Sequence, residues 1–278
     1  MKNLLLWVWL CILVSLSFSS KAVDCSTTTV GLCDPVVEEI ILDEVITEEV
    51  EFQSDGILTT TTTETTIQTT TVTNEDSGDL LDGNNNFVTS SKEGDMDIDW
   101  GGQGPASMRS GSYCNELGTD RCAEITGGSS FTSTMGVENV GTTFIQTVDI
   151  ADLNIKYGGE VKYSIEVDKQ DPQDSVYMHV TGRDGSTDVF SGTDILSASG
   201  TSSGFQIYEN TFNFGGNLTT IIVEVGGRDI GISVGVLFDS VRIDVFYNTI
   251  TQIISQSITS VEMFVALNID APEEVINV

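Results

Sequence analysis

Basic residues are scarce in this chain. Its 278 residues include 11 Lys and Arg but 42 Asp and Glu, which gives a formal net charge of -31. Between Cys25 and Asp82 there is no Lys or Arg at all. Such a chain repels phosphate backbones and anionic lipid surfaces, which excludes nucleic acid as a partner. Divalent cations and neutral glycans are compatible with this charge. The acidity alone also serves solubility in salt water, where charges are screened within about 8 Å.

Histidine is almost absent, which limits the catalytic mechanisms open to the chain. A Ser-His-Asp triad would have to use His179, the single histidine, and no Gly-x-Ser-x-Gly string precedes a predicted helix. The chain also lacks the phosphate-binding string Gly-x-x-x-x-Gly-Lys. Carboxylate pairs that could hydrolyse glycosides are too common in so acidic a chain to be informative. We therefore expect no enzymatic activity.

The N-terminal residues predict export. Lys2 provides a positive charge, residues 4–18 form an apolar run, and small residues near 19–23 offer cleavage sites. A membrane anchor is the alternative, but the run falls short of the roughly 20 apolar residues that span a bilayer. We predict a secretory signal peptide over residues 1–23. The mature chain would then have no membrane span, and it would be secreted or held on an extracellular or virion surface.

The number and spacing of the cysteines are typical of an exported protein with disulfides. One of the five lies in the predicted signal peptide, and the other four form two pairs of identical spacing, Cys25 with Cys33 and Cys114 with Cys122. Pairing within each local pair is the simplest of three connectivities, and each loop would contribute about 2.5 kcal/mol. A zinc site is the rival interpretation, but neither pair has Cys-x-x-Cys spacing and the single histidine lies far along the chain.

Residues 24–79 form an acidic, threonine-rich segment that we expect to be a stalk or linker. Acidic residues crowd positions 38–51, and residues 59–73 are nearly all threonine. This composition buries too little apolar surface to offset about 1–2 kcal/mol of backbone entropy per ordered residue. We predict a disordered or extended segment, ordered only if a partner subunit pairs with it. Residues 35–52 stay ambiguous, because their apolar spacing is helical whereas their β-branched content favours a strand.

Residues 80–248 are predicted to form one all-β domain. Turn dipeptides such as Asp184-Gly185 and Gly226-Gly227 separate short β-rich runs. This spacing predicts a two-sheet antiparallel jelly-roll sandwich, and about 168 residues suffice for an independent core. The predicted strands are 143–150, 160–167, 175–180, 187–190, 205–214, 218–225, 230–237 and 240–247.

Short patterns in this domain resemble those of galactose-binding-like jelly-roll domains, which are typical of many carbohydrate-binding modules. They are Leu80-Leu81-Asp82 with Phe87, Trp100, Phe144-Ile145-Gln146-Thr147-Val148, Gly158-Gly159, Tyr163-Ser164-Ile165 and Leu237-Phe238-Asp239-Ser240-Val241. The resemblance implies two antiparallel sheets, a sugar site on a concave face or at loop tips, and a structural calcium that ties the first strand to the last. The whole chain also resembles proteins encoded by marine bacteriophages that carry the same Thr-rich segment ahead of a similar β-domain.

Two groups of candidate site residues follow. For the calcium that the resemblance implies, Asp239 matches the acid of the closing strand and Asp82 could supply a second oxygen, although Val88 stands where such modules often have Glu. Sugar recognition needs flat aromatic faces beside hydrogen-bonding groups, although many such aromatics simply belong to a core. The candidates for ligand binding are Trp100, Tyr113, Tyr177, His179, Phe205 and Tyr208.

The C-terminal residues 249–278 show a different period. Ile250, Ile254, Ile258, Val261 and Val265 step by four, four, three and four, which predicts an amphipathic helix. It would pack on the sandwich or form a homo-oligomer. Together these features predict a non-catalytic, surface-displayed binding module for carbohydrate. The alternative is a structural protein of a virion or cell surface with no affinity for sugar.

Overall fold

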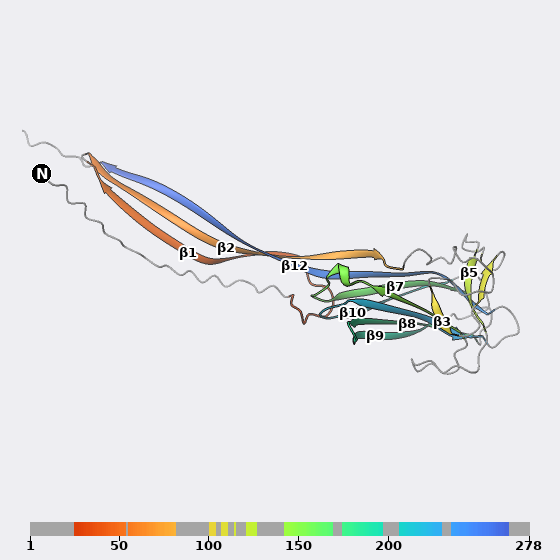
Figure 1. Ribbon diagram of the computed structural model, residues 1–278. Helices are drawn as coiled ribbons and strands as arrows, with labels where there is room; N and C mark the ends of the chain where they lie inside the picture. Colours follow the sequence, from red (N-terminus) through yellow and green to blue (C-terminus); the bar gives the residue numbers. More distant parts are fainter. Residues whose placement is uncertain are drawn as a thin grey trace, which may run out of the picture. The chain divides into compact units, whose positions relative to one another are not determined.

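The computed structural model describes residues 25–53, 55–81, 100–103, 107–110, 114, 121–126, 142–168, 174–196, 206–229 and 235–266. They form two compact units (Figure 1). We call residues 36–71 and 251–266 the ribbon, and residues 25–35 and 72–250 the sandwich. The predicted signal peptide, Asp82, Tyr113, Phe205 and residues 267–278 lie outside the described residues. No helix in the described ranges is long and apolar enough to cross a bilayer.

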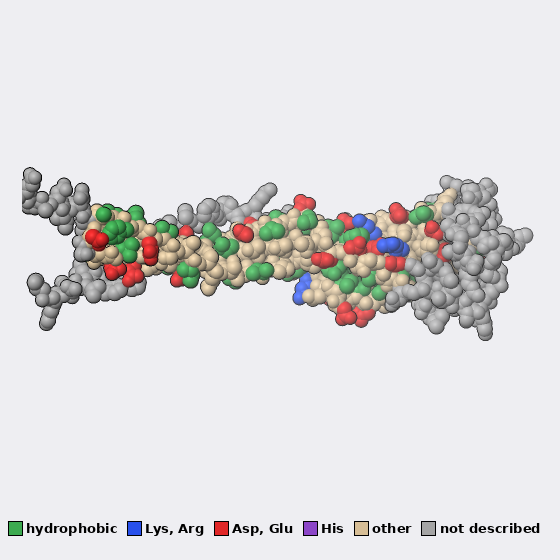
Figure 2. Space-filling model, turned by 90° about the horizontal axis from the view of Figure 1, so that it is seen from above, with side chains coloured by type: hydrophobic (Ala, Val, Ile, Leu, Met, Phe, Trp, Pro, Cys, Tyr) green, Lys and Arg blue, Asp and Glu red, His purple; other side chains and the backbone are tan. Residues whose placement is uncertain are grey.

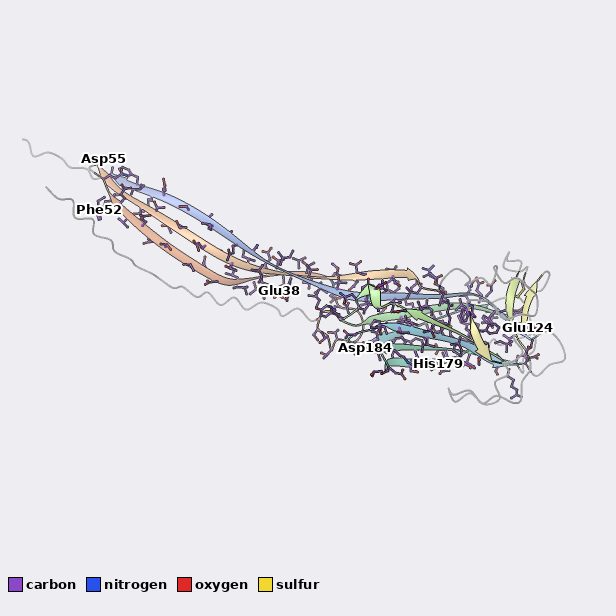
Figure 3. All side chains as sticks on the ribbon, viewed as in Figure 1. Glu38, Phe52, Asp55, Glu124, His179 and Asp184 are labelled. Carbon is purple, nitrogen blue, oxygen red and sulfur yellow. A yellow bond between two sulfur atoms is a disulfide. The ribbon has the colours of Figure 1, made fainter. Side chains whose placement is uncertain are left out.

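The ribbon is formed by β1 (Val36–Phe52) and by parts of two longer strands, β2 (Gly56–Asp79) up to residue 71 and β12 (Val236–Ala266) from residue 251. The three strands are hydrogen-bonded in the order β1-β2-β12. The Gln53 N–H donates to the Gly56 carbonyl at 2.9 Å and closes the turn between β1 and β2, where Figure 3 places Phe52 and Asp55. β-Branched Val, Ile and Thr dominate these strands, and their stiff side chains favour the extended backbone. The acidic segment is therefore extended and paired.

The helix predicted over residues 249–278 is wrong for residues 249–266, because β12 continues as a strand through Ala266. A spacing of four residues fits one face of a helix, but it equally fits one face of a strand, in which side chains alternate. The β-branched content of this stretch and the pairing with β2 decide for the strand. The ambiguity over residues 35–52 is resolved in the same direction by β1.

The sandwich has two antiparallel sheets, which confirms the predicted all-β fold. The first sheet contains β12, β4 (Ser107–Ser110), β5 (Arg121–Ile125), β7 (Gly159–Asp168) and β10 (Gln206–Phe214). The second has the order β3-β6-β11-β8-β9. Its strands are β3 (Gly101–Gln103), β6 (Thr142–Asp149), β8 (Ser175–Asp184), β9 (Thr187–Leu196) and β11 (Thr220–Arg228). A short 3-10 helix, Ala151–Leu153, follows β6.

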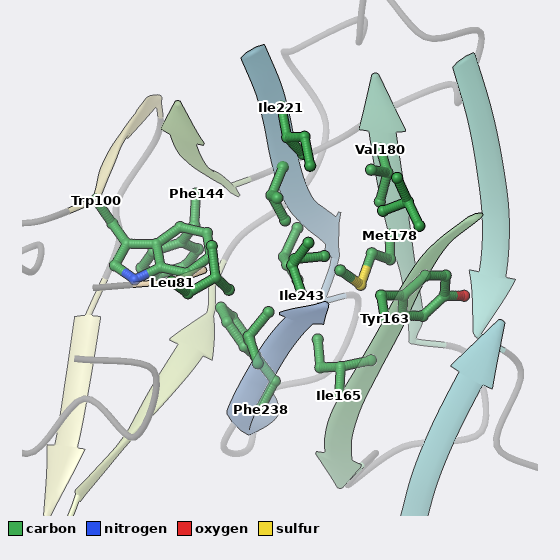
Figure 4. Close-up of a cluster of buried hydrophobic side chains, with 14 of the residues drawn as sticks. Leu81, Trp100, Phe144, Tyr163, Ile165, Met178, Val180, Ile221, Phe238 and Ile243 are labelled. Atoms are coloured by element: carbon green, nitrogen blue, oxygen red, sulfur yellow. The ribbon is translucent and has the colours of Figure 1, made fainter. Parts of the chain in front are cut away.

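One hydrophobic core fills the space between the sheets (Figure 4). Alternate residues of β7 and β11 point into it, as the period of a strand requires. Phe144 and Phe238 pack edge to face across the sandwich with ring centroids 5.0 Å apart. Trp100 and Leu81 lie beside them, each 3% exposed. This core holds the two sheets of the sandwich together.

Residues 25–33 are closed into a loop by a disulfide and held to the rest of the sandwich by polar contacts. The predicted Cys25–Cys33 and Cys114–Cys122 disulfides are both confirmed. The buried Asn248 side chain accepts the Cys33 N–H at 2.8 Å and donates to the Gly31 and Tyr157 carbonyls at 2.9 and 2.7 Å. One amide therefore satisfies backbone groups from two separate segments.

Candidate functional site

The candidate site lies where the edge strands of the two sheets meet. β9 ends the second sheet and β10 pairs only with β7 in the first, and the two edge strands contact each other. The register places Tyr208, Asn210 and Phe212 opposite residues of β7 that point inward. Asp194 lies opposite Met178, which also points into the core. Inward-facing side chains from both edges therefore gather at this rim, which we call the rim cluster.

Asp194 is the polar centre of the rim cluster. Its Oδ2 atom accepts hydrogen bonds from the Tyr163 hydroxyl and from Asn210 Nδ2, both at 2.6 Å. Burial raises the pKa of Tyr163, and its bond to the Asp194 carboxylate raises that pKa further, so this hydroxyl is a permanent donor. Within the described part of the chain no hydrogen bond to Asp194 Oδ1 is found. The carboxylate is thus oriented by two donors and retains acceptor capacity.

Aromatic rings surround this carboxylate. Phe212 stacks on Tyr163 and on Phe190, with centroid distances of 5.9 Å in both pairs. Gly192 makes room for the Phe212 ring, because a Cβ atom there would overlap it. Tyr208 is half-buried and lies two residues before Asn210, on the same face of β10. Its hydroxyl donates to Gln206 at 3.2 Å, and burial raises its pKa. The rim therefore combines flat apolar surface with a positioned carboxylate and amide, which is the chemistry of polyol recognition.

A second polar cluster lies on the other face of β8, away from the core. His179 Nδ1 bonds Thr193 at 2.6 Å, while its Nε2 lies 2.9 Å from the Thr181 hydroxyl and 3.2 Å from that of Ser191. His179 and Thr181 are each 4% exposed. Both ring nitrogens therefore have hydroxyl partners, and this arrangement is that of a satisfied structural histidine.

A carboxylate lies beside this histidine without orienting it. Glu224 stands opposite His179 in the β8–β11 register, but it accepts its hydrogen bond from the Tyr177 hydroxyl. Burial lowers the pKa of His179, and the charges of Glu224 and Asp188 only partly oppose this effect. The lowered pKa favours the neutral imidazole, and its Nδ1 atom bonds a threonine hydroxyl where a Ser-His-Asp triad has a carboxylate.

The residues predicted from sequence fall in different places. Tyr208 lies in the rim cluster, whereas Tyr177 and His179 belong to the buried polar cluster. Trp100 belongs to the hydrophobic core, so its ring is not available to a ligand. Sequence reasoning missed Asp194, Asn210 and Tyr163. The alternation within residues 206–214 places Asn210 on the face of Tyr208, but the contact with Asp194 needs the strand pairing.

The predicted calcium site has one described member. Asp239 is fully buried in β12, where its Oδ1 accepts the Ser240 N–H at 2.8 Å. A bulge in the β7–β12 ladder follows, and Ser240 has a positive φ of 51°. Among the described residues no cluster of three or more His, Cys, Asp or Glu could hold a metal ion. Asp82 lies outside those residues, so the calcium site stays a prediction.

No protein-family model and no curated protein matches the chain. Among solved structures it is similar to the enzymatically active domain of bacteriophage CBA120 tailspike protein 4, with 12% identity and a TM-score of 0.39 over 62% of this chain and 21% of that one. It is also similar to the K1 cleaved adhesin domain of Lys-gingipain from Porphyromonas gingivalis, with 13% identity and a TM-score of 0.32 over 62% and 97% of the two chains.

A third similar structure is the exo-β-1,3-galactanase from Phanerochaete chrysosporium with galactose, with 8% identity and a TM-score of 0.30 over 73% and 54% of the two chains. This chain therefore spans about a fifth of the tailspike chain and about half of the galactanase chain. Because every TM-score is low and every identity is 13% or less, these likenesses carry no argument about what this chain binds or does.

Proposed function

We propose that the sandwich is a non-catalytic binding module for neutral carbohydrate, exposed outside the cell or on a particle surface. The observation that carries the proposal is the rim cluster. Asp194 is held by Tyr163 and Asn210 with acceptor capacity to spare, beside the half-buried rings of Tyr208 and Phe212.

Each group at the rim has a role in such a site. Asp194 Oδ1 would accept sugar hydroxyls, and charge-assisted bonds of this kind are the stronger ones. Asn210 Oδ1 already accepts the Thr211 N–H at 2.7 Å, so its amide would bind sugar as a donor. Tyr208 would offer its ring to the C–H face of a pyranose. The net charge of -31 favours a neutral ligand over an anionic polysaccharide.

The absence of catalysis is part of this proposal. It is supported by the buried, neutral His179, whose two ring nitrogens bond hydroxyl groups and no carboxylate. Location outside the cell is supported by the two disulfides, which persist in oxidising compartments.

The test is a glycan array probed with the wild type, with Asp194→Asn and with Tyr208→Ala. We expect retention on at least one neutral glycan and a loss of about tenfold or more for both variants, since an oriented charged acceptor and a stacking face contribute roughly 1.5–3 kcal/mol each. Asp188→Asn is the matched control, because Asp188 lies on the same strand but pairs with Arg183 at an exposed site. Retention by Asp194→Asn equal to that of the wild type would overturn the assignment, as would release of reducing ends by the wild type.

A structural role in a virion or cell surface is the second candidate function. It is favoured by one observation, the hydrophobic side chains that the ribbon leaves exposed. Such surfaces mark sites of protein association.

A further inference from the structure

The ribbon buries no hydrophobic side chain among its described residues, although many are present. Figure 2 shows hydrophobic side chains at the surface, interspersed with acidic ones. A three-stranded sheet that leaves both faces in water has little to offset the entropy of ordering its chain. The exposed set comprises Val36, Val37, Ile41, Leu42, Val45, Val50, Phe52, Ile253, Ile254, Ile258, Val261, Met263, Phe264 and Val265.

Two contacts between β2 and β12 show which residues share a face. Thr73 and Thr249 join their hydroxyls at 2.7 Å, so odd-numbered residues of the two strands lie together. A Cβ atom on Gly56 would overlap the Phe264 ring, so even-numbered residues share the opposite face. Side chains alternate along a strand, which extends both assignments over the length of the ribbon.

The two faces differ in charge. The odd-numbered residues 57–71 of β2 and 251–265 of β12 are Thr, Ser, Ile, Val and Met, without a single charged side chain. We call them the uncharged face. The even-numbered residues of the same stretches include Glu64 and Glu262. Charged residues are depleted at the centres of protein interfaces, so the uncharged face has the composition of an interface.

Strand β1 adds mostly apolar side chains to the uncharged face. The turn that pairs Gln53 with Gly56 sets Phe52 opposite Ile57, so the even-numbered residues of β1 lie on the uncharged face. Six of these nine residues are apolar: Val36, Ile40, Leu42, Ile46, Val50 and Phe52. The other three are Glu38, Glu44 and Glu48. Of these carboxylates on the edge strand, Glu48 is exposed and Glu44 is half-buried. Glu38 is also half-buried, and its Oε1 atom is buried with no hydrogen-bond partner among the described residues.

We propose that a second copy of this chain packs its uncharged face against this one. The exposed apolar residues of the face present on the order of 800 Å², which equals the area per partner in a standard interface and exceeds the patches typical of monomers. The part of this face formed by β2 and β12 carries no charge that could select a foreign partner by complementary charge. A second copy offers an equally long surface with the same uncharged part.

The acidic residues of β1 oppose edge-to-edge contact through that strand. Edge-to-edge pairing would extend the sheet through β1, whose acidic side chains would then stand beside those of the second copy. Charged edge strands are a known protection against such pairing. Face-to-face packing leaves the more acidic face in water and buries Ile253, Val261 and Met263, which are now 59, 66 and 58% exposed.

Neighbouring isoleucines provide a matched pair of variants. Ile253 and Ile254 are 59 and 65% exposed and lie on opposite faces of β12. In sedimentation equilibrium of the mature chain, we expect a wild-type oligomer and, for Ile253→Glu, a dissociation constant raised by about 100-fold, because a carboxylate would be buried without a partner. Ile254→Glu should change the constant by less than about threefold. Circular dichroism of each variant checks that the strands persist.

Cross-linking provides a second measurement that does not depend on those variants. Ser255 lies on the uncharged face and Gln256 on the other. Because packed sheets stand about 10 Å apart, a short bismaleimide should join two copies of Ser255→Cys much faster than two copies of Gln256→Cys. A monomeric wild type, equal weakening by the two glutamate variants, or equal cross-linking of the two cysteine variants would each overturn the proposal.

Discussion

The sandwich and the ribbon are built from the same kind of strand but are stabilised differently. Every buried hydrophobic residue of the described chain lies in the sandwich, and none lies in the ribbon. Strand β12 shows the difference within one element: Val241 and Val245 are fully buried, whereas every residue from Thr251 to Ala266 is exposed. Backbone pairing and β-branched side chains are therefore enough to specify a strand, but a core must come from a second layer.

The largest expected effect is the difference in free energy of unfolding between a substitution in the core and one in the ribbon. Phe238→Ala should lower the free energy of unfolding by about 3–5 kcal/mol, because it leaves a cavity against Phe144. Ile258→Ala, at a site 69% exposed, should change it by less than about 0.5 kcal/mol. Urea denaturation followed by the fluorescence of Trp100, the only Trp outside the predicted signal peptide, measures both. Equal losses would contradict the contrast between core and ribbon.

The second prediction concerns where the sandwich begins. Asn248→Ala should lower the free energy of unfolding by about 2–4 kcal/mol, because the buried Cys33 N–H and two carbonyls would lose their partner. Asn217→Ala is the control, since the Asn217 side chain is exposed and makes only a long 3.4 Å bond. If both variants melted like the wild type, residues 25–33 would have no structural role in the sandwich.

A third, smaller effect depends on pH. Burial holds the pKa of His179 below its ordinary value of 6.5, so the unfolded chain takes up a proton before the folded one does. The stability is fully present above pH 6.5 and is lost as the pH falls through the lower, folded pKa. We expect His179→Gln to flatten this decline below pH 6.5. Parallel declines in wild type and variant would assign the proton uptake to other groups.

The smallest expected effect is that of calcium. If Asp239 and Asp82 contribute to a site with a dissociation constant near 1 mM, then 1 mM calcium should stabilise the sandwich by about 0.4 kcal/mol. Magnesium at the same concentration is the control. Calorimetry that detects no heat, together with an unchanged melting temperature, would remove the calcium site. Because neither of these residues lies in the ribbon, calcium should not change the dissociation constant of the proposed oligomer.

The sequence was sufficient for the sandwich but not for the ribbon. Alternating runs between turn dipeptides predicted β6, β8, β9 and β11 of the second sheet, because each run carries its own period, whereas the short β3 was missed. The C-terminal pattern misled because isoleucines four residues apart fit a helix and a strand equally, and the choice depends on pairing with β2. Tyr208 was predicted from its own segment. Asp194 could not be, because its role arises only when β9 meets β10.

Because the chain is translated from its N-terminus, β2 is made long before β12, the strand with which it pairs. Thr73 and Thr249, which touch in the folded chain, are 176 positions apart in sequence. A ribosome therefore releases the β1–β2 hairpin long before its third strand exists, and closing so long a loop is slow. The threonine and glutamate side chains of the β1–β2 hairpin hydrogen-bond to water until β12 pairs with β2. A nascent chain interrupted before residue 251 would lack the third strand of the ribbon.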